Sequence, residues 1–196
     1  EAIAAAQRAV DHQPDFWQGW NNLGDAYVAA ARYDEAYAAF EEGAKHKRMD
    51  PSLLFNRGLI DLLRGNYEQG FKRYEMRWHI PEYVRDHGRT FHETHPQWFG
   101  GPLDGKTLLL HAEQGHGDMI QQLRYIPWVQ SHHPARIILE AHKPLIRFIP
   151  RRVPGVQVVT LGDDLPAFDV WCSMMSLCAL HGTTLDNIPP LDLRVA

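Results

Sequence analysis

The sequence predicts an α + α/β protein in which helical repeats precede a Rossmann-like parallel-sheet half-domain. Three observations support this prediction. Residue types recur every 34 positions in the first third of the chain, strand-like and helix-like runs alternate after Lys106, and a segment rich in proline and glycine separates the two patterns. We therefore expect helical repeats over 1–78, a connector over 79–105 and an α/β half over 106–196.

The 34-residue period is that of tetratricopeptide repeats. One interval separates Gly24 from Gly58 and Asn22 from Asn56, and the run Trp20-x-x-Leu23-Gly24-x-x-Tyr27 resembles the pattern of these repeats. The small residues are expected to let antiparallel helices approach closely, while the large ones fill the space between them. The expected helices lie near 1–12, 17–30, 34–47, 51–63 and 67–78, which gives about two and a half repeats.

Asn22 and Asn56 resemble the asparagine ladder in the repeats of protein O-GlcNAc transferases, which contacts substrate backbone. This resemblance implies that the repeats bind a protein or peptide. A spacer or a dimer surface is an equally open interpretation.

Composition narrows the class of protein. The net charge of −4 gives no reason to expect a nucleic-acid partner, and the sequence has no apolar run long enough for a membrane span and no signal-peptide pattern. Cys172 and Cys178 are too few for a disulfide framework, so a reduced, cytoplasmic setting is expected. Because the chain begins with Glu1 rather than Met, we expect a fragment or a processed product.

The connector carries both turn residues and aromatic residues. Trp98 is expected to be buried near the junction of the two halves, since large aromatic side chains are usually packed against other residues. His87, His92 and His95 lie close together, but no cysteine is near and the spacing fits no zinc pattern, so no metal site is predicted.

After Lys106 the alternation of runs implies parallel strands joined by crossover helices. Strands are expected at 107–112, 135–140, 156–160 and 168–172, and helices at 117–131, 143–152 and 174–181. Ligands bind outside the carboxyl ends of such strands. The turn 113–118 and the loops at 141–143 and 160–166 are therefore expected on one edge of the sheet.

The turn Glu113-Gln114-Gly115-His116-Gly117-Asp118 stands between a predicted strand and a predicted helix. Its glycines allow the backbone to approach a ligand, and Asp118 places a carboxylate at a helix start, where it can act chemically or as a helix cap. A dinucleotide fingerprint needs glycine or alanine where Ile120 stands. Glu140 could mimic the ribose-binding acid of that fingerprint, so nucleotide binding is weakened but not excluded.

The motifs around this turn, with Trp98, Gly105-Lys106, Arg124-Tyr125 and Leu165-Pro166-x-Phe168-Asp169, resemble bacterial tetratricopeptide-linked glycosyltransferases. These proteins fuse repeats to a module similar to the ADP-heptose lipopolysaccharide heptosyltransferases. The resemblance implies a GT-B fold and an acceptor-activating base at Asp118. It also implies a substrate-binding role for Glu113, Gln114, Gly115, His116, Gly117, Gln121 and Arg124.

In that family a second Rossmann-like half binds the nucleotide-sugar donor. No such half follows before Ala196, so the chain alone is expected to be inactive and to hold no cofactor. The acceptor would be a sugar or a protein. Two alternatives stay open: a non-catalytic tetratricopeptide adaptor, and the nucleotide-binding module of another enzyme.

Overall fold

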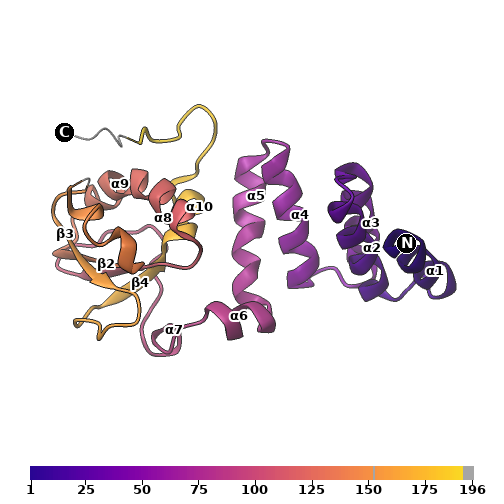
Figure 1. Cartoon of the computed structure of the whole chain (residues 1–196), viewed down its shortest axis with the longest axis horizontal. Coiled ribbons are helices and arrows are strands. Elements are labelled where there is room, and N and C mark those ends of the chain that lie inside the picture. The colour runs from indigo at the N-terminus through magenta and orange to yellow at the C-terminus, as the bar shows by residue number, and fades with distance from the viewer. Residues whose placement is uncertain (152, 192–196) are drawn as a thin grey trace. The chain divides into compact units, whose positions relative to one another are not determined.

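The computed structural model describes residues 1–151 and 153–191, and the chain divides into two compact units between Asp86 and His87 (Figure 1). The predicted connector is therefore shared, since 79–86 belongs to the helical unit and 87–105 to the sheet unit. The predicted α/β half extends to Ala196, and its last residues, 192–196, lie outside the described residues.

The first unit consists of antiparallel helices. They are α1 (Ala2–His12), α2 (Trp17–Ala29), α3 (Tyr33–His46), α4 (Pro51–Leu63), α5 (Tyr67–Tyr74) with the 3₁₀ helix η1 (Glu75–His79), and α6 (Pro81–His87), which crosses the boundary. Helices α2 and α4 begin at residues 17 and 51, and α3 and α5 at 33 and 67, so both pairs are separated by 34 residues. The predicted helices and their period are confirmed.

Glycines at equivalent positions let the paired helices touch. A Cβ on Gly24 would stand 2.3 Å from Cε1 of Phe40, and one on Gly58 would stand 2.7 Å from Cβ of Arg73. Phe40 is fully buried in a core with Leu53. Real Cβ atoms do not approach so closely, so each helix pair depends on the missing side chain.

The second unit contains a four-stranded sheet in the order β3-β2-β1-β4, in which all pairs are parallel. The strands are β1 (Thr107–His111), β2 (Arg136–Ala141), β3 (Val156–Thr160) and β4 (Val170–Ser173). This order is that of the first four strands of a Rossmann sheet. The predicted parallel sheet is thus confirmed, although β4 begins two residues later than expected.

Helices cover one side of this sheet (Figure 1). Between β1 and β2 the chain forms α8 (His116–Gln122), the 3₁₀ turn η2 (Leu123–Tyr125) and α9 (Ile126–Gln130), close to the predicted 117–131. After β4 come η5 (Met174–Ser176) and α10 (Leu177–His181), which ends at Gly182 with φ 67°.

The prediction of a helix over 143–152 was wrong for the residues that the structure describes. The chain there forms two 3₁₀ turns, η3 (Lys143–Leu145) and η4 (Ile149–Arg151), and residue 152 lies outside the described residues. Pro144 and Pro150 explain the difference, because proline has no N–H to donate and a second proline prevents a continuous helix.

The other face of the sheet is covered by part of the predicted connector, within 87–105. Helix α7 (Phe91–Thr94) inserts Phe91 into a core with Leu109, Ile138 and Trp171. Trp98 is buried, as expected, and its backbone N–H donates to the Trp171 carbonyl at 2.7 Å. Trp98 therefore packs within the sheet unit.

Along the described part of the chain, no helix is long and apolar enough to cross a membrane. Cys172 and Cys178 are both buried, and neither forms a disulfide.

Candidate functional site

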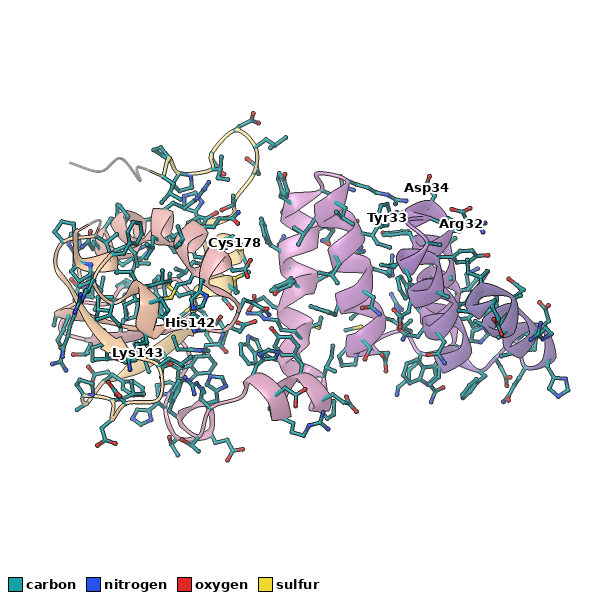
Figure 2. The ribbon with its side chains drawn as sticks, viewed as in Figure 1. Arg32, Tyr33, Asp34, His142, Lys143 and Cys178 are labelled. Atoms are coloured by element: carbon teal, nitrogen blue, oxygen red, sulfur yellow. The ribbon has the colours of Figure 1, made fainter. Side chains whose placement is uncertain are left out.

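The carboxyl ends of β1, β2 and β4 meet at one edge of the parallel sheet, here called the rim. It is formed by the turn 113–118 after β1, by His142 after β2, and by Ser173 at the end of β4. Figure 2 shows His142 and Lys143 directly after β2. Edges of this kind are where ligands bind in open α/β sheets.

Asp118 lies in the first turn of α8 and is exposed, together with Gly115, His116 and Gly117. Its Oδ2 accepts a hydrogen bond from the Gly115 N–H at 3.2 Å. The same carboxylate therefore accepts from the backbone N–H of the N-cap residue, as the third residue of the helix, and faces solvent. The geometry is compatible with both roles that the sequence left open.

Glu113 and Gln114 connect the turn to its neighbours. The Ser173 hydroxyl donates to Oε2 of Glu113, and Nε2 of His142 lies 2.7 Å from the Gln114 carbonyl oxygen. Ser173 and His142 were not predicted as site residues. The signal available in the sequence was their position, since each ends or directly follows a predicted strand.

His116 and His142 form a second contact across the rim. Their rings lie 4.6 Å apart, edge to face. Because a carbonyl oxygen only accepts, His142 carries its proton on Nε2 when neutral, and its Nδ1 has a free lone pair. The rim thus presents an exposed imidazole beside an imidazole of fixed tautomer.

Gln121 and Arg124 follow on the same helical run. Gln121 is exposed, and Nε of the half-buried Arg124 donates to the Gln121 carbonyl at 2.9 Å. The contact that the structure shows for Arg124 is therefore with this backbone, one turn beyond Asp118.

Three buried polar side chains, here called the polar row, stand side by side at the level where the strands end. They are Glu140 of β2, His111 of β1 and Ser173 of β4, none of them more than 2% exposed. Each has a partner from outside the sheet. Nη2 of Arg89 lies 2.5 Å from Oε2 of Glu140, Nε2 of His92 lies 3.2 Å from Nε2 of His111, and Ser173 binds Glu113.

Burial sets the charge state of the two histidines. It lowers the pKa of His111 to about 3, with the neighbouring His92 adding to the effect. It also lowers the pKa of His92 to about 4, with Arg89 as the next cause. Both rings are therefore neutral at pH 7. Among the described residues, no group of three or more His, Cys, Asp or Glu side chains is arranged to hold a metal ion.

Glu140 is engaged elsewhere. The sequence suggested that it could bind a ribose, but its carboxylate is buried and ion-paired with Arg89. The nucleotide-binding alternative therefore loses the acid on which it depended.

In the helical unit, Asn56 donates to Oδ1 of Asn21 and to Oδ1 of Asp25, each at 3.1 Å. Asn22, the residue one period before Asn56, is exposed. The structure thus joins Asn56 to Asn21 and Asp25 of the preceding repeat, and the predicted partner-binding role of Asn22 and Asn56 stays a prediction. Burial raises the pKa of Asp25, against the lowering effect of the Asn21 hydrogen bond.

Together, the fold and the rim define a protein with antiparallel helix repeats and a Rossmann-ordered sheet whose open edge carries exposed polar groups. No family model matches the chain. It is 28% identical over 74 residues to the tetratricopeptide repeat-containing protein trd-1 of Caenorhabditis elegans, which covers 38% of this chain and 10% of that protein. The matched segment thus spans about a tenth of the length of this relative.

A solved structure, a mutant O-GlcNAc transferase from Thermobaculum terrenum, is similar over 84% of this chain and 38% of its own, with a TM-score of 0.38 and 12% identity. Similarity at this level does not determine the activity of either unit.

Proposed function

We propose that the sheet unit is the acceptor-binding half of a repeat-linked glycosyltransferase of the GT-B type. It would transfer a sugar from a nucleotide-sugar to an acceptor hydroxyl once a donor-binding half is present. The observation that carries the proposal is the exposed Asp118 carboxylate, held by Gly115 at the carboxyl edge of a Rossmann-ordered parallel sheet.

The acceptor hydroxyl must lose its proton as it attacks the anomeric carbon, and a carboxylate within hydrogen-bond distance can take that proton. Asp118 is proposed for this role. The Gly115 N–H fixes one of its oxygens, which limits the rotation of the side chain. His116, on the same turn, and Gln121, one helical turn further on, are proposed to contact the acceptor. Glu113 and Gln114 hold the turn in place through Ser173 and His142.

The nucleotide-sugar would be bound by a second Rossmann-like half. The two buried cysteine thiols are consistent with a reducing setting, and a cytoplasmic location is part of the proposal.

The test is transfer measured in the longest natural form of the protein. Release of nucleoside diphosphate from a panel of ADP-, UDP- and GDP-linked sugars is followed with and without candidate sugar and protein acceptors. Acceptor-dependent release that is lost in Asp118→Asn supports the proposal. Absence of release with every donor, or full release in Asp118→Asn, refutes it.

A second candidate is a tetratricopeptide adaptor, favoured by the similarity to a repeat protein and by an open groove of about 530 Å³ on the helical unit. The groove is lined by Ala38, Glu41, Glu42, Ala44, Lys45, Arg48 and Arg57. An adaptor would bind a protein or peptide through this unit with no need of Asp118. Partner binding that survives Asp118→Asn but fails in the double variant Asn22→Ala, Asn56→Ala would favour the adaptor.

A further inference from the structure

The segment 87–95, here called the latch, is held on the sheet by one apolar and two polar side chains. Phe91 enters the core beside Leu109 and Trp171, while Arg89 and His92 reach the polar row. His92 also lies flat against Trp171, with ring centroids 3.9 Å apart and planes 16° from parallel. Helix α7 within the latch has only four residues, so side-chain contacts rather than helix length keep it in place.

A chain of hydrogen bonds determines where the protons lie. The backbone N–H of Arg89 points to Nδ1 of His92 at 3.5 Å, so this ring nitrogen is the acceptor. Nδ1 of His111 faces the Ala112 carbonyl at 3.2 Å and must donate. The neutral tautomers that remain place hydrogen on Nε2 of His92 and a lone pair on Nε2 of His111, which are the two atoms 3.2 Å apart.

The hydrogen-bonded His92 and His111 rings accommodate two ring protons but not three. An added proton on His111 Nε2 would face the His92 N–H directly. An added proton on His92 Nδ1 would face the Arg89 N–H. Either event replaces a hydrogen bond by a contact between two donors inside a buried site.

We propose that the latch is an acid-released device, in which protonation of the His92–His111 pair detaches residues 87–95 and uncovers the apolar sheet face formed by Leu109, Ile138 and Trp171. The proposal does not depend on the glycosyltransferase assignment.

Burial favours a neutral pair in the closed state, and the surrounding charges act in both directions. Arg89 of the latch opposes a further proton, while Glu113 from the turn after β1 favours one. Glu140 of β2 is occupied by Arg89, and β4 contributes the uncharged Ser173. The remaining ionisable side chains of the latch are His87, Glu93 and His95. His95 lies against Phe168, with ring centroids 4.3 Å apart.

The size of the effect follows from linkage. In the released segment His92 regains an ordinary pKa near 6.5, against about 4 in the closed state. Between pH 8 and pH 5 this difference multiplies the released population by about 30-fold. His92 is only half-buried, so solvent screening reduces its share to about tenfold, and the fully buried His111 adds to it.

The experiment is hydrogen–deuterium exchange with peptide resolution from pH 8 to pH 5, corrected for the pH dependence of intrinsic exchange. The protection factors of the amides in residues 87–95 are expected to fall about tenfold or more from pH 8 to pH 5. Those of β1 and β2 should stay the same. In His92→Gln, whose side-chain amide can still donate to His111 but does not titrate, the loss should shrink by about tenfold. The control is His46→Gln, at an exposed position on α3, which should behave as the unchanged protein.

Three results would overturn the proposal: constant protection of residues 87–95 across this range, opening of β1 and β2 in step with the latch, or an unchanged pH dependence in His92→Gln. The variant His111→Gln provides a second test in case His92→Gln loosens the latch at every pH. Its loss of protection between pH 8 and pH 5 should also be smaller than that of the unchanged protein.

Discussion

Replacing Gly24 by alanine tests the packing of the helical unit most directly. The new methyl group would stand 2.3 Å from Cε1 and 2.6 Å from Cζ of Phe40, a side chain with no exposed surface. Overpacking of this kind costs up to about 3 kcal/mol, whereas alanine gains about 1 kcal/mol over glycine within a helix. The expected net loss in the free energy of unfolding is therefore about 2 kcal/mol.

Gly19→Ala is the matched control, because it lies in the same helix α2 and also exchanges glycine for alanine. Its Cβ would meet the Val10 Cγ1 methyl at 3.1 Å, a contact that a small side-chain shift relieves. The change in stability should stay within about 1 kcal/mol of zero.

The assay is urea denaturation followed by far-UV circular dichroism, in which the helical unit supplies most of the helix signal. The transition midpoint should fall clearly in Gly24→Ala and little or not at all in Gly19→Ala. A Gly24→Ala chain as stable as the parent would show that Phe40 is free to move, and the argument from close helix approach would fail.

Three further outcomes are expected. Asp118→Asn in the longest natural form should lower the transfer rate by about 10²–10⁴-fold with little change in melting temperature. Asp118→Ala should also lose about 1 kcal/mol of stability. Full activity in Asp118→Asn would leave helix capping as the role of this residue. Because burial raises the pKa of Asp25, its contribution to stability is greatest below the unfolded value near 3.8 and is lost as the pH rises. The melting temperature of the unchanged protein should therefore lose more between pH 3 and pH 7 than that of Asp25→Asn, and the same pH dependence in both proteins would contradict this. Arg89→Met should lower the free energy of unfolding by about 3–5 kcal/mol, because it leaves Glu140 buried and unpaired. Adding Glu140→Gln should restore much of that loss in urea titrations. A double variant no more stable than the single one would count against the reasoning.

Features that repeat or alternate along the chain were predicted well. The helix starts follow a 34-residue period, and β1 consists of consecutive apolar residues that suit a strand covered on both faces. The burial of Trp98 was likewise expected from its aromatic character. In each case a few neighbouring residues carry enough information to determine the local structure.

Features that depend on distant residues meeting were missed. His92 and His111 are 19 positions apart, and nothing in either local sequence shows that their ring nitrogens approach to 3.2 Å. The same is true of Glu140, which looked like a ligand for a ribose until the structure placed Arg89 beside it. The rim residues were located by the rule for parallel strands, and the roles of Asp118 and its neighbours stay predictions.

The polar row also limits how this sequence can diverge. Each of its members is buried and contacts a specific side chain from outside the sheet, so changing either residue of such a pair leaves a polar group without that hydrogen bond. Substitution by apolar residues is therefore tolerated only when both members of a pair are replaced. Distant homologues are therefore expected to keep Arg89 with Glu140, and His92 with His111, or to have lost both members of a pair together.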